Sequence, residues 1–189
     1  DPTEAVRVLG EAGWNDADSD GFVEKDGQRL EVELLYPTTN TMRAQMAVLI
    51  QADLARIGVK VLPRPVEFAA LMARQEAGDF DGVLAAWEEA TKVDLASGWA
   101  TPGADQGTGN FFGYSNPEVD ELLRQVAAAA DLDRTRVLLA HAQRLIVADQ
   151  PVTFLYEGQQ VVALSRRLKN ATPSAAGVFF GIGGWELGN

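Results

Sequence analysis

The sequence contains no cysteine and a single histidine, His141. Without cysteine there is no disulfide, no thiolate nucleophile and no cysteine-ligated zinc site. A lone histidine inside a helical pattern is more often a packed or half-exposed residue than a catalytic base or metal ligand. No P-loop, nucleophile elbow or zinc-protease helix is present. The sequence therefore argues against an enzyme, and we expect no cofactor.

Long apolar runs and positive charge are also scarce. No stretch approaches the roughly 18 to 20 consecutive apolar residues of a membrane helix. Lysine and arginine number 16 against 27 acidic residues, which gives a formal net charge of −11. A surplus of negative charge repels nucleic acids and anionic lipid surfaces, and it favours solubility. Nucleic acid is therefore not an expected partner.

The first half of the sequence alternates between strand and helix patterns. Alternating apolar residues predict strands near 30–36, 59–64 and 80–87. Between them, apolar stripes predict one helix over about 41–57 and another around 68–77. Strands joined through helices by short links indicate parallel pairing. The predicted fold class is α/β, with a mainly parallel open sheet and flanking helices.

The second half begins with a long irregular stretch. Residues 88–115 have no periodicity and are rich in Gly, Asp, Thr and Asn, which is typical of a functional loop. Two helices are expected after it, starting near Asn116 and Leu132. Residues 152–157 and 160–164 then show patterns typical of two further strands.

The turn Asp16–Gly21 matches the first six positions of a calcium-binding loop, and Glu24 stands at the ninth. The twelfth position, which supplies a bidentate Glu in such loops, is Gly27. Asp and Gly are also common turn residues. We therefore expect an ordered turn without calcium, and no metal site.

The order of several local motifs resembles a known family. These motifs are Glu11-Ala12-Gly13-Trp14 before the Asp-rich turn, the run 50–59, the stretch Asn110-Phe-Phe-Gly-Tyr-Ser-Asn-Pro-Glu-Val-Asp120, Asp133-Arg134, and 143–151. In this order they resemble the second lobe of family 5 extracytoplasmic solute-binding proteins. The resemblance covers nearly all of 1–189. It implies one C-terminal substrate-binding lobe of a periplasmic-binding-protein type II-like fold, a fragment whose missing N-terminal lobe closes on it around the ligand.

The resemblance also implies a function. Such proteins are the substrate-binding components of ABC importers and capture dipeptides, oligopeptides or, in some members, nickel complexes. Membrane permease subunits would be partners, and the location would be periplasmic or extracytoplasmic, either free or membrane-anchored. Two alternatives stay open: the same lobe used as a sensor or chaperone-like module, or a partner domain of an α/β enzyme with Glu88, Glu89 and Asp94 as its acidic set.

Ligands of open parallel sheets bind beyond the carboxyl ends of the strands. Those ends are expected at 36–40, at 62–66 and from Trp87 onward, and the family pattern also places a cleft-lining tryptophan where Trp87 stands. Peptide-binding members carry an aspartate shortly after it for the peptide ammonium group, whereas Glu88 and Glu89 follow here. The candidate ligand-binding residues are Thr38, Asn40, Trp87, Glu88, Glu89, Asp94, Trp99, Asn110, Phe111 and Tyr114.

Overall fold

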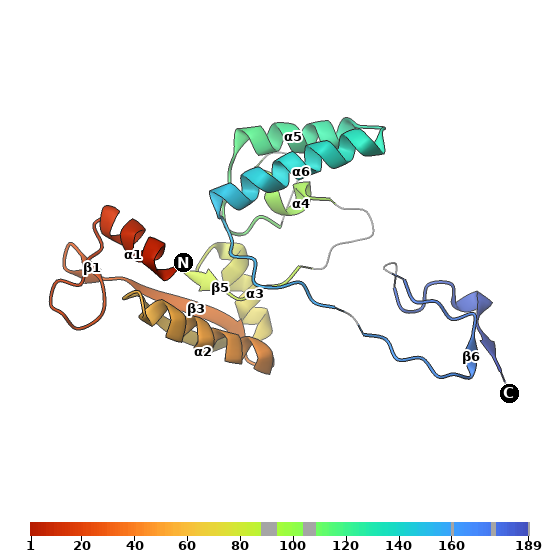
Figure 1. The fold of residues 1–189 in the computed structure, drawn as a ribbon, viewed down its shortest axis with the longest axis horizontal. Coiled ribbons are helices and arrows are strands. Elements are labelled where there is room, and N and C mark those ends of the chain that lie inside the picture. Colours follow the sequence, from red (N-terminus) through yellow and green to blue (C-terminus); the bar gives the residue numbers. More distant parts are fainter. Residues whose placement is uncertain (88–93, 104–108, 160, 175–176, 189) are drawn as a thin grey trace. The chain divides into compact units, whose positions relative to one another are not determined.

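The structure is a computed structural model that describes residues 1–87, 94–103, 109–159, 161–174 and 177–188. The chain divides into two compact units, Asp1–Trp87 and Glu88–Asn189. Figure 1 shows the first unit in red to yellow and the second in green to blue. Each unit has a hydrophobic core of its own.

The first unit is built on a three-stranded parallel sheet in the order β4-β3-β5. Its strands are β3 (Glu31–Pro37), β4 (Lys60–Val66) and β5 (Gly82–Val83). The parallel sheet predicted from these three segments is confirmed. The third strand is shorter than the predicted 80–87: its pairing with β3 covers Gly82 and Val83, and the Leu84 N–H donates to the Leu35 carbonyl oxygen at 2.9 Å.

Three helices accompany this sheet: α1 (Pro2–Glu11), α2 (Thr41–Ala55) and α3 (Phe68–Ala77). Each begins at a side chain that accepts backbone N–H groups, namely Asp1, Asn40 and Glu67. Helix α2 packs against β3 and β4, where the core gathers Leu34, Ala47, Val59, Val61 and Leu84. A small antiparallel hairpin, β1 (Glu24–Lys25) and β2 (Gln28–Arg29), precedes β3.

Gly58 makes the tight turn from α2 into β4. Its φ of +80° is a conformation that side chains rarely adopt, and a Cβ there would lie 2.8 Å from Val23 Cγ1. The Val23 N–H also donates to the Gly58 carbonyl oxygen at 2.8 Å. Glycine at this position therefore allows the Asp-rich turn to pack closely on the start of β4.

The hydrophobic core of the second unit is formed mainly by helices. It contains α4 (Ala96–Trp99), α5 (Pro117–Ala128) and α6 (Leu132–Asp149), followed by β6 (Leu168–Lys169), a 3-10 helix η1 (Ile182–Gly184) and β7 (Glu186–Leu187). Helices α5 and α6 lie side by side (Figure 1) and bury Val119, Leu122, Leu123, Ala142 and Ile146. Among the described residues, no helix combines the length and apolar character needed to cross a bilayer.

The strands predicted at 152–157 and 160–164 are not found in the described part of these segments. Phe154, Leu155 and Tyr156 are instead 57%, 49% and 61% exposed. Alternating apolar residues give a segment strand propensity, but a strand also needs a neighbouring edge to pair with. In the described chain that edge is missing for this segment, whereas β6 and β7 pair with each other.

Candidate ligand-binding site

The carboxyl ends of β3 and β4 meet at one edge of the parallel sheet. The Thr38 N–H donates to the Val66 carbonyl oxygen at 2.9 Å, which ties the two strand exits together. Thr38 is exposed at this edge, as a ligand contact would be. Asn40 is half-buried, and its Oδ1 accepts the Arg43 N–H at 2.9 Å. Asn40 therefore has a role as the cap of α2.

Trp87 closes the described part of the first unit, four residues beyond β5. It is 47% exposed. A tryptophan that fills a core loses most of its surface, so this exposure favours a surface role for the indole ring. Glu88 and Glu89 lie outside the described residues.

Asp94 is exposed and stands just before α4. One of its carboxylate oxygens, Oδ1, accepts the Ala96 N–H at 3.1 Å, and its carbonyl oxygen accepts the Ser97 hydroxyl at 3.2 Å. Asp94 therefore shapes the start of a short helix while its carboxylate stays at the surface. Such a group can still pair with a cationic ligand.

Trp99 and Phe111 lie differently in the second unit. Trp99 is 9% exposed, and its ring packs against Phe112, Tyr114 and Phe154 with centroids 5.3, 6.2 and 5.9 Å away. Phe111 is half-buried. Of the two aromatic residues, Phe111 has more surface left for a ligand.

Asn110 and Tyr114 are both buried, at 8% exposure each. The Asn110 Nδ2 donates to the carbonyl oxygens of Ala100 and Tyr114, each at 2.8 Å, and its Oδ1 accepts the Tyr114 N–H at 3.0 Å. Both the Nδ2 and the Oδ1 of the Asn110 side chain thus have backbone partners. Direct contact of these two residues with a ligand stays a prediction.

Asp149 is a residue of this region that the sequence did not single out. Its Oδ2 accepts the Tyr114 hydroxyl and the Asn116 Nδ2, both at 2.7 Å. These bonds, that of Tyr114 first, hold the pKa of Asp149 below its usual value. Burial, and then the bond to Asp149, raises the pKa of Tyr114, so its hydroxyl stays a donor at neutral pH. Asp149 is the last residue of α6, where a negative charge interacts unfavourably with the helix dipole. This unfavourable position is the feature of the sequence that could have pointed to Asp149.

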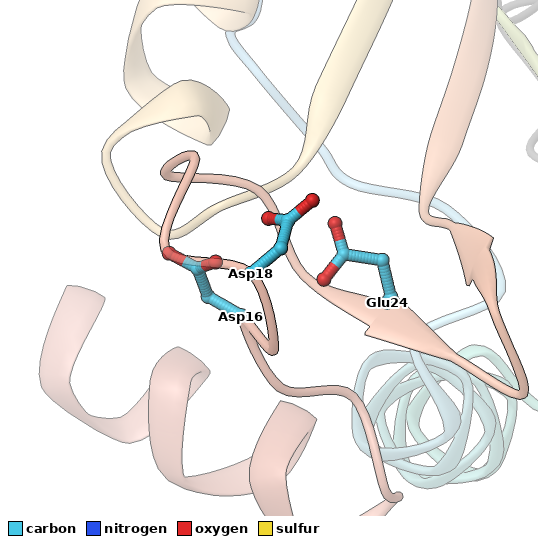
Figure 2. Close-up of side chains that lie close together, drawn as sticks. All are labelled: Asp16, Asp18 and Glu24. Carbon is cyan, nitrogen blue, oxygen red and sulfur yellow. The ribbon is translucent and has the colours of Figure 1, made fainter.

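The Asp-rich turn brings three carboxylates together. Oxygens of Asp16, Asp18 and Glu24 all lie within 4.8 Å of one another, and Figure 2 shows the three side chains converging. Each also accepts a backbone N–H: Asp16 from Gly21, Asp18 from Asp20 and Glu24 from Ala17, at 3.0 to 3.1 Å. The second Glu24 oxygen lies 3.8 Å from the Arg29 Nε. These contacts give the carboxylates a role in the turn itself.

Titration of calcium into the protein is expected to show no saturable binding at low micromolar concentration and no rise in unfolding midpoint. Calcium takes six to eight oxygen ligands, and the bidentate Glu of such loops is replaced by Gly27. Calorimetry on the protein and on Asp18→Asn is the measurement. Saturable heat in the wild type that Asp18→Asn removes would contradict this expectation.

A cavity of about 270 Å³ lies between α1, the Asp-rich turn and the end of α2. Its lining includes Leu9, Trp14, Val23, Ile57 and Gly58. Val23 and Gly58 precede β3 and β4, so this cavity is near the amino ends of the strands. Parallel sheets bind ligands at the opposite, carboxyl edge.

Residues 1–109 match the family described as bacterial extracellular solute-binding proteins, family 5, middle region. The match covers more than half of the chain. The chain belongs to this family. Its members are transport binding proteins rather than enzymes, and the family description places them outside the cytoplasm.

Individual relatives agree with the family match. Oligopeptide-binding protein AppA of Bacillus subtilis is 30% identical over 168 residues, which cover 88% of this chain and 31% of AppA. The structure of AppA in complex with a nonapeptide superposes with a TM-score of 0.84 at 28% identity, over 99% of this chain and 37% of that chain. The nickel-binding periplasmic protein of Escherichia coli is 38% identical over 80 residues, which are 42% of this chain and 15% of that protein.

The chain therefore spans well under half of the length of each of these relatives. The resemblance inferred from the order of the local motifs is confirmed, and so is the α/β fold class with a parallel sheet and flanking helices.

Proposed function

We propose that residues 1–189 are the C-terminal substrate-binding lobe of a two-lobed protein that captures peptides for an ABC importer. The observation that carries the proposal is the superposition on the peptide-bound AppA structure over 99% of this chain. The family match over 1–109 supports it. The missing N-terminal lobe would close on this one, and membrane permease subunits would receive the peptide outside the cytoplasm. In this role the protein is not an enzyme.

The candidate contacts with the ligand are considered within each unit by itself. Thr38 and the half-exposed ring of Trp87 belong to the first unit, and Asp94 and Phe111 belong to the second. An indole ring accepts varied peptide side chains because it offers a large apolar face and one donor. The carboxylates of Asp94, Glu88 and Glu89 are the candidates to pair with a peptide ammonium group.

A nickel complex is a second candidate ligand. The observation that favours it is the 38% identity to the nickel-binding periplasmic protein, which is higher than the identity to AppA but extends over only 80 residues. Because this match covers 42% of the chain and the match to AppA covers 88%, we place a nickel complex below peptides as a candidate ligand.

Calorimetry on the full-length protein tests both candidates. We expect saturable binding of peptides from a mixed set of two to nine residues, and no comparable binding of a nickel–histidine complex. N-acetylated versions of the bound peptides form the matched control, because acetylation removes the ammonium charge. Tight binding of the nickel complex without peptide binding would reject the proposal.

A further inference from the structure

The last part of the chain exposes a group of large apolar side chains. This part, hereafter the C-terminal hairpin, consists of β6 and residues 177–188, which contain η1 and β7. Four of its side chains are between 57% and 76% exposed, namely Phe179, Phe180, Ile182 and Leu187. The buried clusters found among the described residues include no residue of the hairpin. Exposed apolar groups that lie together in this way mark an interaction surface.

The hairpin has only a short ladder of backbone hydrogen bonds. Its two strands are two residues long, with Leu168 opposite Leu187 and Lys169 opposite Glu186. The Gly188 N–H extends the pairing by donating to the Arg167 carbonyl oxygen at 2.7 Å. A single two-stranded hairpin is marginally stable in water unless it packs on another surface. The short ladder therefore indicates that a further surface supports the hairpin.

The charge of this region is opposite to that of the whole chain. Positions 165–188 contain three basic residues, Arg166, Arg167 and Lys169, and one acidic residue, Glu186. The whole chain carries 16 basic and 27 acidic residues. All three cations are exposed. The hairpin therefore fits a partner surface that is apolar and has carboxylates at its rim.

These features favour a partner within the same protein. The chain covers 31% of AppA, while 99% of its own length superposes on the AppA structure. In a two-lobed protein, a surface on the other lobe is present at a high effective concentration. A second copy fits less well, because a symmetric dimer would bring the two sets of cations to one interface. A membrane also fits less well, since the net charge of −11 opposes anionic lipid.

We propose that the C-terminal hairpin docks on the missing N-terminal lobe through its exposed apolar side chains and its three cations. This inference rests on the proposed function, because it takes the chain as part of a two-lobed protein. The hairpin then moves with the N-terminal lobe and not with α5 and α6. Residues 153–159, which are exposed and form no strand in the described chain, are part of the connection between these two bodies.

The first test is hydrogen exchange in the full-length protein without peptide. Docking predicts that amides at 177–188 exchange at least about tenfold more slowly than those of an unstructured chain. Leu187→Asp places a charge in the proposed interface and is expected to speed this exchange by about tenfold. Leu132→Asp is the matched control, because Leu132 at the start of α6 is 73% exposed against 76% for Leu187. No change at 177–188 is expected in the control.

The second test identifies the partner surface. Phe180 is replaced by the photo-crosslinking residue p-benzoylphenylalanine in the full-length protein, and the cross-linked fragments are identified by mass spectrometry. Docking predicts cross-links within one molecule to residues outside 1–189. The same probe at Leu132 is the control and is expected to give no cross-links to those residues.

Each outcome decides the inference. Slow exchange at 177–188 together with cross-links to the N-terminal lobe supports it. Free exchange in the wild type overturns it, and so do cross-links between two copies or only to residues 1–159. Slow exchange that appears only after anionic vesicles are added also overturns it, since the hairpin then binds a membrane surface. None of these measurements uses peptide, so a protein that binds no peptide rejects the proposed peptide capture and leaves the docking to be decided by its own tests.

Discussion

Replacing Trp87 by alanine in the full-length protein is expected to weaken peptide binding by roughly 30-fold, with little change in unfolding midpoint. Aromatic hot-spot residues commonly contribute ~2 kcal/mol or more to binding, and each 1.4 kcal/mol corresponds to a factor of about ten. Trp87 stands four residues after β5, a strand of the parallel sheet, on the side of its carboxyl end. The residue is 47% exposed. Calorimetric titration and thermal unfolding on the same samples are the measurements.

Trp99 offers a matched control with the same side chain. It is 9% exposed and packs against three other rings, so Trp99→Ala leaves a cavity. Truncation of a buried tryptophan costs ~3–5 kcal/mol of stability, and the unfolding midpoint should fall accordingly. If Trp87→Ala instead lowers the midpoint as Trp99→Ala does and leaves affinity unchanged, Trp87 is a core residue and leaves the site.

The 189-residue chain alone is expected to bind peptides at least about 100-fold more weakly than the full-length protein. Ligand sites of this kind bury most of the ligand surface, and in two-lobed proteins closure of the lobes achieves this. One lobe offers only part of the contacts, whereas the ligand still loses its translational and rotational freedom on binding. The net binding free energy therefore falls by a larger fraction than the contact energy does.

The measurement is a titration of the same peptides into both proteins, after circular dichroism and thermal unfolding have shown that the shorter chain is folded. Comparable affinities would mean that the ligand site is complete within 1–189. The single-lobe interpretation would then be wrong, although the family membership would stand.

The two core helices of the second unit and the sheet of the first could be predicted from local patterns. The start of α5 at Pro117 and the span of α6 over Leu132–Asp149 follow the capping residues and apolar stripes of the sequence. The strand at Glu31–Pro37 follows the alternation of its side chains. Alternation alone was insufficient at 152–157, because pairing depends on a neighbouring strand that the segment's own residues do not encode.

The candidate site was predictable only in part. Thr38 and Trp87 follow strands of the parallel sheet, so the rule for such sheets makes both of them predicted ligand contacts. The partners of Asn110 and Tyr114 could not be found in this way, although both residues were singled out. A side chain in an irregular loop has no periodicity, and its composition does not show whether it faces a ligand or its own backbone.

The sequence by itself determined the longer helices, the parallel pairing of the three strands and the resemblance to the family, because each is encoded by local spacing and by motif order along the chain. The tertiary structure alone decided how Tyr114 is held. Tyr114 and Asp149 are 35 residues apart in sequence, and their hydroxyl–carboxylate bond exists only because α5 and α6 fold back on each other. A contact between positions so far apart depends on the packing of whole helices and leaves no periodic pattern in either segment.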